Sequence, residues 1–233
     1  MFRVEVEDEE DQRYVDSGLE TFLAIDKAGA GILDKMTSNS KKLLRNIAKK
    51  HNLDYYVLRE GKDEFVRGRG DAVGLIDFQT FEGGHWNSFY YIRSEDRFIL
   101  YDSRFDLYTL DCDEGQYYLL QFSDYVDYTG NSCNSDHPLV ERAREIRPGY
   151  NARQPATEWD TSHASQHQFC LAESLMFLEE LLGDIPVSVC RNTRDSLVTA
   201  KRYVGKCADI LKFPVHPEFF FVYDDDGGGP SPV

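Results

Sequence analysis

The sequence lacks a long apolar run, a CxxC cysteine motif and the features of a secretion signal. No stretch approaches the roughly 18 apolar residues that span a membrane. The opening MFRVEVEDEEDQ has neither a basic start nor an apolar segment. The five cysteines are an odd number without close pairing, which favours free thiols in a reducing compartment over disulfides. We therefore expect a soluble, intracellular protein that does not associate with membranes.

Positive charge is also scarce. The chain has 26 Lys and Arg residues against 41 Asp and Glu residues, which gives a formal net charge of −15. A nucleic-acid-binding protein normally shows the opposite balance, because Lys and Arg must neutralise phosphates. We therefore expect no nucleic-acid partner, and we attribute the acidic excess to solubility or to a basic partner.

The remaining composition is that of a folded protein. A hydrophobic content of 41% and an aromatic content of 13% over 233 residues are sufficient for a sizeable core. We expect an acidic lead at 1–13, one domain at 14–223 with an insertion at about 129–160, and a flexible tail at 224–233. The proline-containing insertion is expected to be irregular.

Hydrophobic periodicity and turn residues predict the order of the elements. Helical spacing occurs in SNSKKLLRNIAKKHN, which Ser40 can cap, in QFCLAESLMFLEELLGD, which Gly183 ends, and in RDSLVTAKRYVGKCADILKF. A further helix is expected within CDEGQYYLLQFSDYVDY. DYYVLRE, AVGLIDFQTF, WNSFYYIR and RFILYDS are typical of strands. This order predicts an α+β fold with a central antiparallel or mixed sheet packed against a buried helix.

Cys170 lies in the first turn of the most apolar helix. The free backbone N–H groups and the dipole of a helix N-terminus favour a thiolate, which is the nucleophile of acyl-transfer enzymes. The structural alternative is that Cys170 is a small buried apolar residue.

His85 and Asp102 mark the two ends of an aromatic hairpin. A thiol nucleophile needs a base, and the base needs a group that fixes its tautomer. With a turn at Glu95-Asp96, both residues fall on one sheet face but lie roughly 13 Å apart along the strand. A bulge, or bending at the preceding glycines, would bring them together. The structural alternative is a histidine packed beside Trp86.

The order of GGHW (83–86), YDS (101–103) and QFCLAESLMFLEELL (168–182) resembles the adenovirus-protease and SUMO-protease group of cysteine peptidases, and most of all its variants in large DNA viruses. This resemblance covers residues 72–183. It implies that Cys170 attacks the carbonyl, that His85 acts as general base and acid, and that Asp102 orients His85. Trp86 then forms a wall of the site, and no cofactor is needed.

The resemblance also implies an oxyanion-hole glutamine six or seven residues before the cysteine, where this chain has Ala164 and His163. The candidate oxyanion donors are therefore Gln166, Gln168 and His163. The implied substrate is a protein, either a viral structural precursor or a ubiquitin-like conjugate, cleaved at a peptide or isopeptide bond after small residues.

Two other functions compete with the peptidase. His163, His167 and Cys170 have the i, i+4, i+7 spacing of zinc ligands on a helix, with Asp160 or His85 as a fourth ligand. The third alternative is a catalytically inactive relative that binds a partner protein through its acidic surface or the 129–160 insertion.

Overall fold

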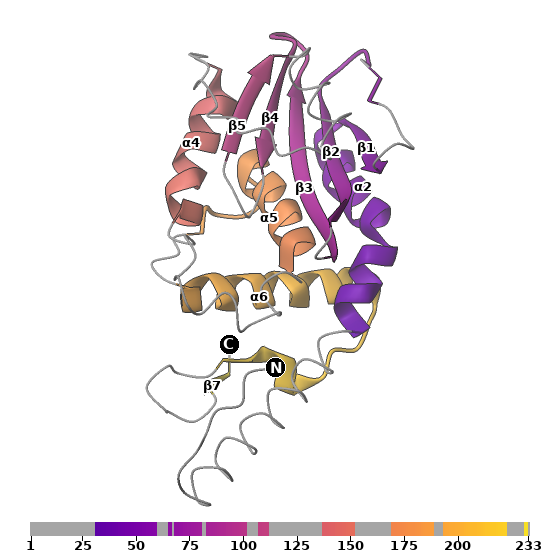
Figure 1. Ribbon diagram of the computed structural model, residues 1–233, viewed down its shortest axis with the longest axis vertical. Helices are drawn as coiled ribbons and strands as arrows, with labels where there is room; N and C mark the ends of the chain where they lie inside the picture. Colours follow the sequence, from indigo (N-terminus) through magenta and orange to yellow (C-terminus); the bar gives the residue numbers. More distant parts are fainter. Residues whose placement is uncertain are drawn as a thin grey trace, which may run out of the picture.

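The computed structural model describes residues 31–59, 65–66, 68–80, 83–101, 107–111, 137–151, 169–188, 193–222 and 231–232. A helix over 31–38 precedes α2 (Ser40–His51), β1 (Asp54–Arg59), β2 (Ala72–Thr80), β3 (Gly83–Ile92), β4 (Arg97–Tyr101) and β5 (Leu107–Asp111). The chain continues with α4 (Pro138–Asn151), α5 (Cys170–Leu182), α6 (Thr193–Leu211), the 3-10 helix η2 (Pro217–Phe220), β6 (Phe221–Val222) and β7 (Ser231–Pro232). This is an α+β fold, as the sequence predicts (Figure 1).

The main sheet has the strand order β1-β2-β3-β4-β5. β1 is parallel to β2, and the other neighbours are antiparallel, so the sheet is mixed. β2 and β3 pair without a bulge from Ala72↔Tyr91 to Thr80↔Gly83. All of the strands that the sequence predicts are present.

The two faces of the sheet bury different residues. Val73, Tyr90 and Ile99 share one core cluster with residues of α2, α4, α5 and α6. Their neighbours Ala72 and Phe89 belong to a second cluster on the opposite face, because successive side chains of a strand point to opposite sides. The helices therefore cover one face, and an aromatic cluster lies on the other.

α5 is the central helix of the first cluster. It packs against β3, α2, α4 and α6, and Figure 1 shows it lying along the sheet between α2 and α4. Nearly all of its side chains are buried, from Cys170 to Leu181. It ends at Gly183, whose φ of 80° is the left-handed conformation that glycine adopts most easily. The predicted buried helix that begins at the cysteine is confirmed.

The structure corrects four local predictions. Ser40 does not cap α2 but is buried inside it; Asn39 takes the N-cap position, and its side chain donates to the Lys35 carbonyl at 2.8 Å. The β3–β4 connection is Arg93–Asp96 rather than a tight turn at Glu95-Asp96, because β3 ends at Ile92 and β4 begins at Arg97.

The other two corrections concern segments expected to be irregular. Within 129–160, α4 is a regular helix that packs against α5. Within the tail expected to be flexible, Ser231–Pro232 pairs with Phe221–Val222. The helix predicted in CDEGQYYLLQFSDYVDY and the acidic lead lie outside the described residues.

Among the residues that the structure describes, no helix is both long enough and apolar enough to cross a membrane.

Candidate functional site

Cys170 is the first residue of α5, and Phe169 takes the N-cap position. The cysteine is a free thiol with only 5% of its surface exposed. The backbone N–H groups of a first helical turn have no acceptor within the helix. The thiol is thus held where these N–H groups are concentrated, as the sequence predicts.

The His85-Trp86 dipeptide lies near the start of β3, and both residues are buried. Trp86 belongs to the same core cluster as Phe169 and Cys170. One hydrogen bond fixes the strand to the helix: Ser174 Oγ donates to the Trp86 carbonyl oxygen at 2.9 Å. Ser174 stands one helical turn after Cys170, so the first turn of α5 is tied to the strand beside His85.

A second contact fixes the direction of α5 along β3. The Phe177 ring stacks on the Tyr101 ring, with centroids 4.5 Å apart and planes 10° apart, and Tyr101 pairs with Ser88 on β3. The step from Ser174 to Phe177 on α5 therefore runs in the same direction as the step from Trp86 to Ser88 on β3. Cys170 precedes Ser174 by one helical turn, which is about 6 Å along the helix axis. This length corresponds to about two residues of a strand. Cys170 is therefore level with Gly84 and His85.

The faces of β3 separate the two side chains. Trp86 and Tyr90 share the α5 face, whereas Phe89 and Tyr91 belong to the cluster on the other face. Regular alternation assigns His85 to the side of Phe89 and Tyr91. Cys170 and His85 are thus level along the strand, but the thiol lies on the α5 face and the imidazole on the other.

Two phenylalanine rings and a buried lysine lie close together near the start of α5. The centroids of Phe169 and Phe219 are 6.3 Å apart, and Lys201 Nζ lies 5.5 Å from the Phe219 centroid. Lys201 is only 6% exposed. The sequence analysis did not single out Lys201 or the Ser174 side chain that donates to Trp86. Each is a polar residue at an otherwise apolar position of a predicted helix, Ser174 in α5 and Lys201 in α6, and this pattern could have indicated them.

The other predicted site residues lie outside the described residues. These are Asp102, the oxyanion candidates His163, Gln166 and Gln168, and the zinc-ligand candidates Asp160 and His167. Among the residues that are described, no three His, Cys, Asp or Glu side chains meet as metal ligands. The oxyanion and zinc assignments therefore remain predictions.

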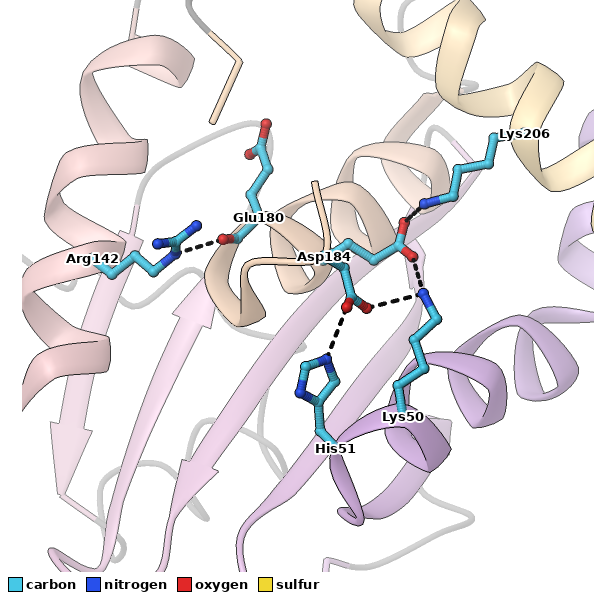
Figure 2. Close-up of polar contacts among 7 residues, drawn as sticks. Lys50, His51, Arg142, Glu180, Asp184 and Lys206 are labelled. Atoms are coloured by element: carbon cyan, nitrogen blue, oxygen red, sulfur yellow. Dashed lines mark hydrogen bonds and ion pairs between the residues drawn. The ribbon is translucent and has the colours of Figure 1, made fainter. Parts of the chain in front are cut away.

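The C-terminal end of α5 holds a network of charges (Figure 2). Glu179 is only 3% exposed; its carboxylate pairs with Lys50 of α2 at 3.4 Å and with Lys206 of α6. Asp184 accepts from Lys50 at 3.1 Å and lies 3.1 Å from His51 Nε2. Two helices are thereby fixed to the end of α5.

The backbone at this end is tied to α4 as well. Arg142 Nε donates to the Glu180 carbonyl oxygen at 2.7 Å, and the Glu180 carboxylate accepts from the Ser188 N–H at 2.8 Å. Figure 2 shows the Arg142 side chain reaching from α4 to the end of α5. Ionic and hydrogen-bonded contacts thus hold the C-terminal end of the helix whose first residue is Cys170.

The charges of this network shift two pKa values. Burial alone would raise the pKa of Asp184, but the hydrogen bonds from Lys50 and His51 lower it. Burial alone would lower the pKa of Lys50, but the hydrogen bond to Asp184 and the charge of Glu179 raise it. The Asp184–Lys50 pair is thus stabilised in its charged form.

Asp184→Asn should lower the free energy of unfolding by about 0.5–1 kcal/mol near neutral pH. Because the folded-state pKa of Asp184 is depressed, its stabilisation is present above the unfolded value of about 3.9 and is lost as pH falls through the lower folded value. Urea denaturation of both proteins at a series of pH values below neutral measures this, and the difference between them should shrink as the pH falls through the lowered pKa of Asp184. Asp209→Asn, an exposed change on α6, is the matched control. A difference that does not depend on pH would contradict the ionic origin.

Comparisons of this chain with protein-family models, with curated proteins and with solved structures found no match.

Proposed function

We propose that the protein is a cysteine peptidase in which Cys170 is the nucleophile, His85 the general base and acid, and Asp102 the residue that orients His85. The observation that carries this proposal is the hydrogen bond from Ser174 to the Trp86 carbonyl. It holds the first turn of α5 level with the His-Trp dipeptide. A triad requires the segments of His85, Asp102 and Cys170, which are distant in sequence, to meet there. The segments of His85 and Cys170 lie at the same position along β3.

The reaction forms and breaks an acyl–sulfur bond. Cys170 Sγ, having given its proton to His85, attacks the carbonyl carbon of the scissile bond. The C–N bond then breaks as His85 returns the proton to the leaving amine. Water activated by His85 hydrolyses the thioester and regenerates the thiol. In this proposal, backbone N–H groups at the start of α5 donate to the oxyanion, together with Gln166, Gln168 or His163.

Catalysis by His85 requires a change at the start of β3. The imidazole must pass to the α5 face, because strand alternation assigns it to the other face. Gly83 and Gly84, which pair with Thr80 and Gln79, immediately precede it and lack the Cβ that limits backbone rotation. The peptidase proposal therefore includes a rotation of this strand end when substrate binds.

The proposed substrate is a protein cleaved after small residues such as Gly-Gly at a peptide or isopeptide bond. Of the two classes that the resemblance implies, we favour a viral structural precursor over a ubiquitin-like conjugate. The support is the sequence around Cys170, which is closer to the large-virus variants of the family.

Alkylation by iodoacetamide at pH 7 tests the reactive thiol. We expect Cys170 to be modified faster than the other cysteines, and His85→Ala to slow its modification about tenfold or more by removing the base. Cys207 is an internal reference, because burial, together with the nearby Glu179 charge, raises its pKa to about 12. Peptide mass spectrometry over time gives the rate at each cysteine.

Two results of this experiment would count against the peptidase. One is modification of Cys170 no faster than Cys207. The other is an unchanged Cys170 rate in a folded His85→Ala protein, which would favour a structural histidine. Stoichiometric zinc in the purified protein, removable only by strong chelators, would favour the zinc-site alternative.

A further inference from the structure

The outer face of α2 carries an uncompensated row of positive charge. The helix contains Lys41, Lys42, Arg45, Lys49 and Lys50 and no acidic residue. The first four of these side chains are exposed. Lys50 pairs with Glu179 and Asp184, whereas none of the other four forms an ion pair within the described part of the chain. We call these four residues the α2 basic face.

This arrangement is unusual for a chain with a net charge of −15. Acidic residues outnumber basic ones across the sequence, yet none of the described ones neutralises the α2 basic face. Lys42 and Lys49 are seven residues apart and therefore lie on one side of the helix, next to Asn46, whereas Lys41 and Arg45 lie farther round it. The favourable interaction of Lys49 with the helix C-terminus accounts for one cation only.

A hollow borders the basic face. A cavity of about 420 Å³ lies between α2 and α6, with Glu179 of α5 also contributing to its lining. Its apolar wall includes Leu43, Ile47 and Ile210, and Lys49 and Lys50 also line it. Figure 2 shows Lys50 of α2 and Lys206 of α6 reaching toward the end of α5. Lys42 and Lys49 thus lie on the side of α2 that borders this recess, whereas Lys41 and Arg45 lie on the side away from it.

We propose that α2 and the adjoining recess form a docking site for an acidic peptide segment of a partner protein. Carboxylates of the segment pair with Lys42 and Lys49, and an aliphatic side chain enters the recess between α2 and α6. An amphipathic helix supplies both kinds of group, because two of its carboxylates seven residues apart match the spacing of the two lysines. The proposal does not depend on the peptidase activity.

Two observations favour an acidic peptide over a nucleic acid. The aliphatic wall of the recess offers nothing to a phosphate backbone, but it accommodates a leucine or isoleucine side chain. The net charge of −15 repels a long polyanion, whereas a short peptide contacts only the local cations, because charges farther away than about 8–10 Å are screened at physiological salt.

Fluorescence anisotropy of the full chain tests this surface. The probe is a fluorescein-labelled helical peptide that repeats Glu-Glu-Leu-Leu, measured at low and at physiological salt. We expect salt-sensitive binding that weakens about tenfold or more in Lys42→Glu/Lys49→Glu, because two attractive contacts become repulsive. These side chains are exposed, so circular dichroism should show an unchanged fold.

The matched control reverses two exposed cations elsewhere, in Arg69→Glu/Arg93→Glu. It changes the net charge equally, so binding within about twofold of the original chain supports a local site. An equal loss in the control variant would overturn the proposal, as would absence of peptide binding at low salt. Tighter binding of an oligothymidine or of anionic vesicles than of the peptide would also overturn it, in favour of those partners.

Discussion

Replacing Cys170 by alanine is expected to reduce peptide hydrolysis at least about a thousandfold, because the acyl–sulfur intermediate can no longer form. The assay uses a peptide ending in Gly-Gly joined to an aminocoumarin, whose release is followed by fluorescence. Cys207→Ala is the matched control, since Cys207 is the other buried free cysteine that the structure describes and lies on α6. We expect this control to retain activity. A Cys170→Ala protein that keeps most of the activity would end the peptidase assignment.

Replacing His85 distinguishes a base from a packing residue in the same assay. His85→Ala should lower the rate by about a hundredfold or more, with added imidazole restoring part of it. If the imidazole only fills space on the face opposite α5, His85→Ala should instead lower the free energy of unfolding and leave Cys170 alkylation unchanged. Measuring both quantities on one protein separates these outcomes.

The fold could be predicted where a segment has one strong periodic signal. α5 was predicted from its leucine spacing and from Gly183, and four strands were predicted from their aromatic and β-branched residues. β5, with the sequence LYTLD, was missed because it is short and is flanked by polar residues. α4 was expected to be irregular because of its prolines, yet Pro138 stands at the start of the helix, where a missing N–H costs nothing, and Pro148 stands only in its last turn.

The site could be predicted only in part, because β3 is apolar on both faces. Trp86 and Tyr90 on one side and Phe89 and Tyr91 on the other are all buried. Alternation therefore places His85 and Trp86 on opposite faces without showing which face α5 covers. That choice depends on contacts far apart in sequence, such as the Ser174–Trp86 hydrogen bond. The level of Cys170 along β3 rests on the same contacts.

The aromatic face of the sheet depends on one glycine. Gly74 pairs directly opposite Phe89, and a Cβ added to Gly74 would lie 2.0 Å from Phe89 Cε1. The Phe89 ring is fully buried and packs edge-on against Phe65 and Phe98, so it has no space to move. Gly74→Ala should therefore lower the free energy of unfolding by about 3 kcal/mol, measured by urea denaturation. Gly70→Ala, where an added Cβ meets nothing within 4 Å, should change it little.

A double-mutant cycle with Phe89→Leu shows whether this steric overlap is the cause. Leucine lacks the ring atoms that an alanine at position 74 would meet, so the second change should relieve much of the overlap. The two substitutions together should therefore cost less than the sum of the single changes, with a coupling of about 1–2 kcal/mol. Purely additive losses would mean that Gly74→Ala acts through backbone conformation. A clear coupling would establish that Phe89 covers Gly74 on the face to which alternation assigns His85.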